Sequence, residues 1–311
     1  MKIVAIVQAR MGSARLPDKV MKSICGTPMI GLLLERLSQS KHIDNIVLAT
    51  SDDAKNNVLS KYVKKLGFDV YCGSENDVLD RYYRAAKSSN ADVIVRITGD
   101  CPLIDPKLVD EIISVFMQNE FDYVSNTLYP TYPDGLDTEV FTFKALDRAW
   151  CEAITLHDRE HVTPFIKFSD GFNRKNIVND VDFSSERWTL DEPDDLEVIM
   201  NVFEYFQPKL SFSWREVIEL SKNKPTLFNI NKHLNRNEGA TLGTGQKLWK
   251  RAKRVIPGGS MLLSKRGEMF LPEQWPVYFS KAKGCRVWDM DDNEYIDMSI
   301  MGIGTNVLGY G

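Results

Sequence analysis

The sequence opens with an apolar stretch followed by a basic loop, Lys2-Ile-Val-Ala-Ile-Val-Gln-Ala-Arg10-Met-Gly-Ser-Ala-Arg15-Leu-Pro-Asp-Lys19. The run of β-branched residues from Ile3 to Val7 predicts a buried strand. Up to about residue 220, short apolar runs of this kind alternate with segments of helical period, which is the pattern of a sheet flanked by helices. In a parallel sheet the carboxyl ends of the strands face the ligand crevice. The basic loop is therefore placed to hold a substrate.

The alternation predicts an α/β fold with a mostly parallel sheet flanked by helices. We expect strands at residues 3–7, 45–49, 68–71, 93–97 and 123–125. We expect helices at residues 29–38, 54–66, 78–87 and 107–118, and another that begins near Pro193 with three carboxylates in its first turn.

The composition of the sequence changes near residue 229, where a polar, glycine-rich stretch begins. Such composition is typical of a linker. We expect a first domain at residues 1–225, a linker at 226–245 and a small C-terminal segment at 246–311. That segment should hold a helix at 246–255 and a hairpin around residues 291–293.

Composition excludes several classes of protein. The chain has 311 residues, a net charge of −4 and 43% hydrophobic residues, so it is not a general binder of nucleic acid or anionic membranes. No apolar run reaches the roughly 18 residues of a membrane span, and no signal peptide is recognisable, so we expect a cytoplasmic protein. The five cysteines are odd in number and never form C-x-x-C, which predicts reduced, buried thiols.

The basic loop carries Arg10, Arg15 and Lys19, with Gly12 and Ser13 allowing close approach of the backbone. Arginine forks and a lysine point charge suit a polyphosphate. The loop is neither a Walker A motif nor a G-x-G-x-x-G fingerprint. The alternative is a basic surface loop.

Two aspartates are candidate magnesium ligands. Asp100 follows the apolar run at 93–97, and Asp191 ends a second short apolar stretch before a helix. Hard dications such as Mg²⁺ prefer carboxylate oxygens and substrate phosphates. Asp191 has an alternative role, because an aspartate at this position often caps a helix.

These motifs together resemble a known family. Arg10, Arg15-Leu-Pro-x-Lys19, Gly99-Asp100-x-Pro102 and Asp191-x-Pro193-x-Asp195 resemble the cytidylyltransferases that activate acidic sugars, the CMP-Kdo synthetase group. The branch named for spore-coat polysaccharide biosynthesis is similar also at Gly73 to Arg81, at Val124-Ser-Asn126-Thr and at Arg159-Glu-His161-Val-Thr-Pro. The resemblance covers about residues 1 to 220. Cys101 departs from it, since CMP-Kdo synthetases carry an acidic residue there.

The resemblance implies a Rossmann-like nucleotidyltransferase fold, CTP and a small acidic acceptor as substrates, and Mg²⁺ held by Asp100 and Asp191. We expect catalytic roles for Arg10, Arg15, Lys19 and Asp100. We expect the nucleotide to contact Ala9, Arg10, Met11, Gly12, Ser13, Lys19, Ser74, Asn76, Asp77, Arg81, Thr98 and Gly99. We expect the acceptor to contact Asn126, Asp137, Glu139, Arg159, His161 and Arg187. The family also suggests a homodimer that binds neither nucleic acid nor membrane.

The C-terminal segment resembles a different family. Leu248-Trp-Lys-Arg-Ala-Lys-Arg-Val-Ile-Pro-Gly-Gly259 and Gly284-x-x-Val-Trp-Asp-x-Asp-x-Asn-Glu-Tyr-Ile-Asp297 are similar to the opening of class III aminotransferases, the glutamate-1-semialdehyde aminomutase branch. The part of that domain with the Schiff-base lysine is missing. We therefore expect a truncated fusion in which pyridoxal phosphate would bind only to the longer protein.

The resulting hypothesis is an enzyme that transfers CMP from CTP to an acidic sugar or a phosphorylated or phosphonate acceptor and releases pyrophosphate. One alternative is a glycosyltransferase that uses a nucleotide-sugar. Another is a nucleotide-binding scaffold for an aminotransferase, without catalytic activity. The basic loop favours a triphosphate over a nucleotide-sugar.

Overall fold

The computed structural model describes the chain except residues 14, 235, 237–242, 261–265, 272–274 and 299–311. The chain divides into two compact units, Met1–Arg236 and Asn237–Gly311. The first unit contains a seven-stranded sheet, and the second contains a helix and a three-stranded sheet. Among the described residues, no helix combines the length and the apolar character needed to cross a membrane.

The sheet of the first unit has the strand order β5-β4-β1-β6-β8-β7-β9. Strand β8 runs antiparallel to both of its neighbours, and the other pairs are parallel. The expected α/β fold with a mostly parallel sheet is confirmed. The strands are β1 (Ile3–Gln8), β4 (Asn45–Ser51), β5 (Asp69–Gly73), β6 (Val93–Thr98), β7 (Tyr123–Ser125), β8 (Glu139–Thr142) and β9 (Arg174–Asn176).

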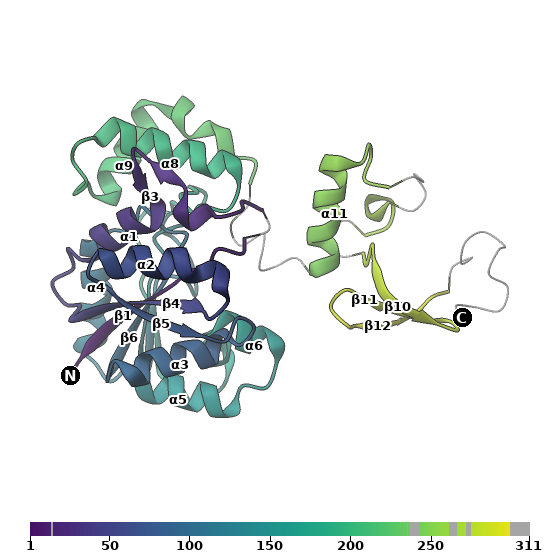
Figure 1. Cartoon of the computed structure of the whole chain (residues 1–311), viewed down its shortest axis with the longest axis horizontal. Helices are drawn as coiled ribbons and strands as arrows, with labels where there is room; N and C mark the ends of the chain where they lie inside the picture. The colour runs from purple at the N-terminus through teal and green to yellow at the C-terminus, as the bar shows by residue number, and fades with distance from the viewer. Residues whose placement is uncertain (14, 235, 237–242, 261–265, 272–274, 299–311) are drawn as a thin grey trace. The chain divides into compact units, whose positions relative to one another are not determined.

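Helices cover both faces of the sheet (Figure 1). Along β1, Ile3, Ala5 and Val7 belong to one apolar core, while Val4 and Ile6 belong to the other. This alternation follows from the two-residue period of a strand, and it explains why the strand is apolar throughout. The first core packs under α1 (Met29–Leu37), α2 (Asn57–Lys65), α4 (Pro106–Met117), α8 (Pro193–Phe206) and α9 (Trp214–Asn223). The second packs under α3 (Val78–Ser88), α5 (Phe143–Glu152) and α7 (Pro164–Phe168), and α6 (Leu156–His161) lies against α3 and α7.

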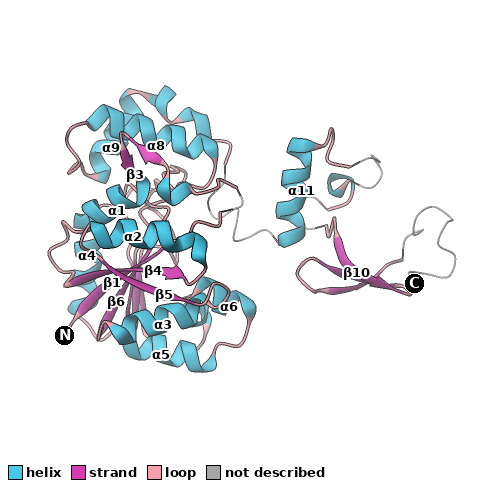
Figure 2. Ribbon diagram, in the orientation of Figure 1, coloured by secondary structure: helices cyan, strands magenta, loops and turns pink. Residues whose placement is uncertain are grey.

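The sequence located the early strands and helices to within about two residues at most ends, and missed several later elements (Figure 2). Strand β8 was overlooked because it starts with Glu139, a charged residue that is only 3% exposed. Its charge is balanced by Arg96 and Lys167, which no local pattern reveals. The short elements β2 (Ser23–Ile24), β3 (Thr27–Pro28), η1 (Lys19–Met21) and η2 (Ala54–Asn56) also emerge only from the structure.

Residues 226–236, expected to begin the linker, belong to the first compact unit. The segment forms η3 (Pro225–Leu227) and η4 (Asn229–Asn231) beside α8. Asn231 is buried, and its amide donates to the carboxylate of Asp195 at 2.9 Å and to the carbonyl of Arg187 at 3.0 Å. Asn231 therefore helps to hold the segment that leads into the first turn of α8. The linker residues 237–242 lie outside the described part of the chain.

The second unit contains α11 (Thr244–Val255), η6 (Gly267–Met269) and the strands β10 (Phe279–Lys283), β11 (Arg286–Asp289) and β12 (Glu294–Ile296). The expected helix and hairpin are present, and β10 adds a third antiparallel strand. Asp289 holds the hairpin turn, because its carboxylate accepts hydrogen bonds from the backbone of Asp291 and Asn293 and from the hydroxyl of Tyr295. Residues 299–311 of the expected aminotransferase segment are outside the described range.

All five cysteines are free, as expected, but only Cys101 is buried. The expectation of buried thiols was wrong for the other four, which lie at exposed positions. Cysteine is among the most buried residue types on average, but Cys72 lies in the edge strand β5, and the other three lie in turns or at a helix end.

Two glycines bring distant loops together at the carboxyl end of the sheet. The amide of Gly99 donates to the carbonyl of Gln8 at 2.7 Å, and a Cβ on Gly99 would lie 2.5 Å from that oxygen. Gly135 has a φ of +105°, and a Cβ there would lie 2.6 Å from the carbonyl carbon of Trp188. Beyond Trp188, the amide of Leu190 donates to the carbonyl of Asp100 at 2.8 Å. The chain before α8 is thus fixed between two loops.

We predict that Gly135→Ala destabilises the first unit by roughly 3 kcal/mol or more, because it adds both backbone strain and a clash with backbone atoms. Gly67→Ala is the matched control, since Gly67 has a similar φ of +91° but nothing within 4 Å of the added Cβ. It should cost only about 1–2 kcal/mol. Chemical denaturation of both variants gives the comparison. Equal losses would mean that the close approach at Gly135 is unimportant.

Candidate active site

The centre of the candidate site is a cluster of one lysine and two aspartates, Lys19, Asp100 and Asp191, called here the lysine–aspartate cluster. The Lys19 ammonium lies 3.0 Å from Oδ2 of Asp100 and 2.7 Å from Oδ1 of Asp191. Lys19 begins η1, Asp100 follows the end of β6, and Asp191 precedes α8. Three segments that are far apart in the sequence therefore meet at the carboxyl end of the parallel strands, as topology predicts.

Electrostatics keep this cluster ionised. Burial opposes charge on Asp100, but the neighbouring Lys19 outweighs it and lowers the pKa of Asp100 to about 2. Burial alone would lower the pKa of Lys19, yet the charges of Asp100 and Asp191 raise it. Near neutral pH the low pKa of Asp100 therefore keeps its carboxylate charged beside the Lys19 ammonium. Together with Asp191, which contacts the same ammonium, Asp100 offers carboxylate oxygens to a further cation.

Asp191 is not the cap of α8. Glu192 is the N-cap residue, and Asp195 accepts hydrogen bonds from the backbone amides of Asp191 and Glu192, each at 2.9 Å. The carboxylate of Asp191 instead pairs with Lys19 and, at 2.9 Å, with Arg15. The loop residue Arg15 therefore reaches the cluster, and the side chain of Asp191 faces the site.

Arg187 supports the cluster from behind. Its guanidinium makes two bonds to Asp195, at 2.9 and 3.0 Å, and one to Asp134 at 3.2 Å. One of its amino groups also lies 3.6 Å from Asp191. Because Arg187 is only 7% exposed and anchored on both sides, it orients the segment that carries Asp191. The contact of Arg187 with an acceptor stays a prediction.

A second charged group continues from Asp134 to Asp137 and Glu139, and we call these three residues the acidic row. Glu139 pairs with Arg96 at 2.7 Å and with Lys167 at 3.2 Å, and Asp137 pairs with Arg236. The row contains the expected acceptor residues Asp137 and Glu139. It is electrostatically continuous with the lysine–aspartate cluster, because the charge of Asp100 acts on Asp134.

The pKa values of the row shift in opposite directions. Burial raises the pKa of Glu139, but Lys167 and Arg96 outweigh it and lower the value to about 2. Burial and the charge of Asp137 raise the pKa of Asp134 to about 7. Burial also raises the pKa of Asp137, although Arg236 opposes the shift. Nearby cations therefore compensate the buried charge of Glu139, whereas the buried charges of Asp134 and Asp137 are not fully compensated.

The expected nucleotide residues form a separate group along the basic loop. Arg10 pairs with Glu75 at 2.8 Å, and Lys55 lies 3.6 Å from the same carboxylate. The side chain of Asn56 accepts a hydrogen bond from the backbone amide of Met11 at 2.8 Å, which fixes the first turn of the loop. Arg10 and Lys55 are each 46% exposed, so both can exchange their carboxylate partners for phosphate oxygens.

The loop after β5 is fixed from within. Arg81 donates to the carbonyl of Ser74 at 2.6 Å, and the backbone amide of Asp77 donates to the hydroxyl of Ser74 at 3.0 Å. Arg159 makes a forked pair with Asp77, with one bond of 3.0 Å from Nε to Oδ1. Arg159 therefore joins the expected nucleotide loop rather than the acidic row. Asn76 lies on the same loop, between Glu75 and Asp77.

The remaining expected residues have structural contacts. Asn126 ties its loop to the chain at residues 136–138, since its amide nitrogen donates to Leu136 and its oxygen accepts from Thr138. The ring of His161 lies 4.6 Å from that of His157 on α6. The side-chain hydroxyl of Thr98 lies 3.1 Å from the thiol of Cys101. Ala9 packs against the space that a side chain at Gly99 would fill.

Comparisons with known proteins identify the family. The profile described as Cytidylyltransferase matches residues 4–203. This chain belongs to the cytidylyltransferase family. It is 37% identical over 237 residues to an uncharacterised protein of Methanocaldococcus jannaschii, covering 75% of this chain and 96% of that protein. It is 33% identical over 231 residues to the spore coat polysaccharide biosynthesis protein SpsF of Bacillus subtilis, covering 72% and 95%.

A solved structure of a cytidylyltransferase from Leptospira borgpetersenii superposes with a TM-score of 0.71 at 35% identity, covering 73% of this chain and 97% of that one. As a cytidylyltransferase the chain is a CTP-dependent nucleotidyltransferase, and the expected enzyme class is confirmed. The resemblance to the spore-coat branch is also confirmed. The family match ends at residue 203 and does not extend to the second unit.

Sequence reasoning missed several residues that this cytidylyltransferase brings into the site region. In each case the side chain bonds to or pairs with a residue in another segment of the chain. These residues are Lys55, Asn56, Arg96, Asp134, Lys167, Asp195, which holds the start of α8, and Arg236. Asp134 had a local signal, because it precedes Gly135 in the stretch that leads to the expected acceptor residues Asp137 and Glu139. Arg236 had none, since it lies in a stretch with the composition of a linker.

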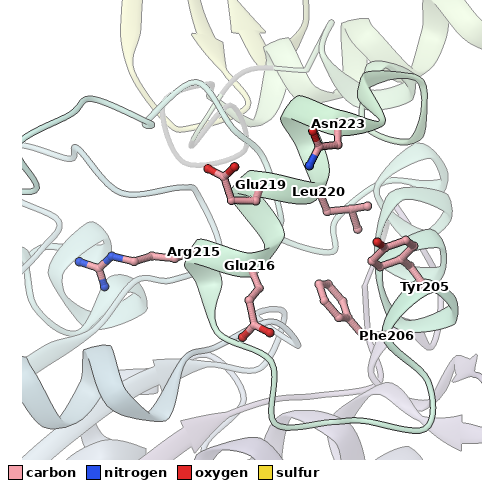
Figure 3. Close-up of a pocket in the computed structure, with 7 residues that line it drawn as sticks. All are labelled: Tyr205, Phe206, Arg215, Glu216, Glu219, Leu220 and Asn223. Atoms are coloured by element: carbon pink, nitrogen blue, oxygen red, sulfur yellow. The ribbon is translucent and has the colours of Figure 1, made fainter.

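Within the described part of the chain, no three His, Cys, Asp or Glu side chains lie close enough to hold a metal by themselves. A shallow groove of about 300 Å³ lies between α8 and α9, lined by residues such as Tyr205, Leu220 and Asn223 (Figure 3). No residue of the lysine–aspartate cluster or the acidic row lines this groove.

We predict that Glu139→Gln destabilises the cytidylyltransferase by about 3–5 kcal/mol near neutral pH, because it leaves Arg96 and Lys167 buried without their carboxylate. The folded pKa of Glu139, about 2, lies below its ordinary value of 4.5, so its contribution is present above pH 4.5 and is lost as the pH falls toward 2. The gap between variant and wild type should shrink over that range in denaturant titrations.

Glu152→Gln is the control for this variant, since Glu152 pairs with Arg148 on the exposed face of α5. Its cost should stay below about 0.5 kcal/mol. If Glu139→Gln lowered the free energy of unfolding by as little as Glu152→Gln, the pairing with Arg96 and Lys167 would contribute little to the stability of the fold.

Proposed function

We propose that the enzyme transfers CMP from CTP to an acidic sugar and releases pyrophosphate. The observation that carries the proposal is the lysine–aspartate cluster, which lies between a basic loop and the acidic row at the carboxyl end of the sheet. The similarity to SpsF, a protein of polysaccharide biosynthesis, supports a sugar as the acceptor. Phosphorylated and phosphonate acceptors are the other acidic compounds that the same cations would accept.

In this reaction a hydroxyl oxygen of the acceptor attacks the α-phosphorus of CTP, and the bond to the pyrophosphate oxygen breaks in line with it. The protein mainly positions the groups and neutralises charge. Arg10, Arg15 and Lys19 hold the triphosphate and compensate the charge that develops on pyrophosphate. Arg10 and Arg15 are 46% and 38% exposed, so phosphate oxygens can reach them.

The residues present fit a magnesium ion. Asp100 and Asp191 direct carboxylate oxygens at one point, where the Lys19 ammonium now lies, and two carboxylates with substrate phosphates suit the octahedral preference of Mg²⁺. Such an ion would neutralise phosphate charge and orient the triphosphate. Because Lys19 contacts both carboxylates, it must move when the ion and nucleotide bind, and the phosphates offer it new partners.

We place the base in the loop after β5 and the acceptor along the acidic row. The loop from Ser74 to Asp77 is held rigidly by Arg81 and Arg159, which suits a pocket that reads a base by fixed hydrogen bonds. On the other side, the cations that accompany the acidic row provide partners for an anionic acceptor.

For the second unit we propose an aminotransferase origin. The support is the sequence similarity of its helix and hairpin to the opening of class III aminotransferases, together with the presence of both elements.

Pyrophosphate release tests the proposed function and separates it from its rivals. The full chain is mixed with CTP, Mg²⁺ and in turn 3-deoxy-manno-octulosonate, N-acetylneuraminate, a sugar phosphate and a phosphonate. We expect release with at least one acid and at least about tenfold less with UTP, because an unpaired group in the base pocket costs about 1–3 kcal/mol. If none of the acceptors leads to pyrophosphate release, the result would favour the scaffold. Consumption of a nucleotide-sugar would favour the glycosyltransferase.

We predict that Asp100→Asn and Asp191→Asn each lower turnover by roughly 100- to 1,000-fold, because each removes charge where the phosphoryl group is transferred. If both hold one ion, the double variant should be little worse than the poorer single variant. Steady-state kinetics over a range of Mg²⁺ concentrations gives both comparisons. Asp170→Asn, at an exposed position away from the cluster, is the control and should behave like wild type.

One result would remove Asp191 from the ion site. If Asp191→Asn kept near-normal turnover and lost only about 1 kcal/mol of stability, its carboxylate would serve the fold through Lys19 and Arg15 alone. Asp100 and the phosphates would then have to hold the ion.

A further inference from the structure

Arg236 reaches the acidic row from the end of the first unit. Its Nη1 donates to the carbonyl of Tyr132 at 3.0 Å, and its Nη2 pairs with Asp137. Only 14% of its side chain is exposed. Both partners belong to the loop between β7 and β8, so the guanidinium is held against the expected acceptor side by two contacts that lie about 100 residues earlier in the sequence.

The guanidinium retains an unused donor. The Nε of Arg236 is buried and has no hydrogen-bond partner among the described residues. A buried N–H without an acceptor is costly, and the planar guanidinium presents its donors as a fork that matches a carboxylate. Since Nη1 is used by Tyr132 and Nη2 by Asp137, Nε is the donor of Arg236 that is left for a second anion.

Arg96 repeats this feature at the other end of the row. Its Nη1 pairs with Glu139 at 2.7 Å, while its Nε is likewise buried without a partner in the described part of the chain. The charges of Asp137 and Glu139 act on each other, so the two arginines flank one electrostatic unit. Two guanidinium groups beside the same row thus each keep a buried donor without an acceptor, and a buried donor of this kind gains from an anion that binds to it.

We propose that Arg236 is a specificity-determining residue that binds the acidic group of the acceptor. Asp137 and Tyr132 keep the guanidinium oriented, and its remaining donor, Nε, donates to a carboxylate oxygen of a sugar acid. This inference rests on the proposed transfer of CMP to an acidic sugar, and it assigns the residue that selects the acid.

The position of Arg236 fits this role. Arg236 and Asp100 both act electrostatically on Asp134, and Asp134 contacts Arg187, which faces Asp191. The acidic row thus links Arg236 to the lysine–aspartate cluster through a short series of neighbouring charges. An acceptor with its acid on Arg236 would extend its hydroxyl groups along the row toward the place where CTP is held.

The test compares Arg236→Ala and Arg236→Lys with wild type in the full chain. With 3-deoxy-manno-octulosonate or N-acetylneuraminate as acceptor, the alanine variant should raise the acceptor KM roughly 10- to 100-fold, the range of a charge-assisted hydrogen bond. The KM for CTP should change by less than about twofold. Arg236→Lys should recover part of the loss, because it keeps the charge but not the fork.

Lys232→Ala is the matched control, since it removes a cation from an exposed position four residues earlier in the same segment. It should leave both KM values unchanged. Thermal denaturation of every variant shows whether the fold is intact, and saturation-transfer NMR with the same sugar acids measures their binding in the absence of turnover. A folded alanine variant that no longer shows saturation transfer to the acid supports the assignment.

Two negative results are distinguishable. If wild type turns over a sugar acid and Arg236→Ala does so with the same acceptor KM, Arg236 only ties its segment to the loop, and this inference is wrong while the proposed function stands. If wild type neither binds nor turns over any sugar acid, the proposed acceptor class fails and the inference fails with it.

Discussion

The site depends on one ammonium placed between two carboxylates. Lys19 is 81 residues from Asp100 and 172 from Asp191, and it is their common counter-charge. Two carboxylates this close would repel each other in a partly buried position without it. The ammonium therefore joins the basic loop, the end of β6 and the entrance of α8, and the backbone contacts around Gly99 and Gly135 hold those segments where the pairing is possible.

That arrangement also implies an exchange of partners. In the described state Arg10, Arg15 and Lys19 are all neutralised by carboxylates, namely Glu75, Asp191 and the pair around Lys19. A triphosphate offers these three cations stronger, forked partners. If these cations bound phosphate in the proposed reaction, Asp100 and Asp191 would lose their counter-charge, and a divalent cation would replace it. Nucleotide binding and metal binding would then be linked, because each would relieve the charge that the other leaves unbalanced.

The sequence predicted the layers of the fold and the centre of the site because both follow from local patterns. Apolar runs with period two mark strands, and residues that follow strand ends meet at one edge of a parallel sheet, which correctly brought Lys19, Asp100 and Asp191 together. Local patterns fail where a charge is buried by a partner far along the chain. Glu139 in β8 looked like loop, and Arg236 looked like linker, because their partners are invisible to any window of sequence.

The two halves of the site differ in what their carboxylates need, and this difference bears on how acceptors are selected. Asp100 and Glu139 have lowered pKa values because cations satisfy them fully, so they serve as fixed charges. Asp134 and Asp137 have raised values because burial is not fully compensated there. A region of incomplete compensation gains most from a ligand that brings its own polar groups. If the acceptor binds along the acidic row, as proposed, a change of sequence in the loops around Asp134 and Asp137 would alter the acceptor while the lysine–aspartate cluster stays the same.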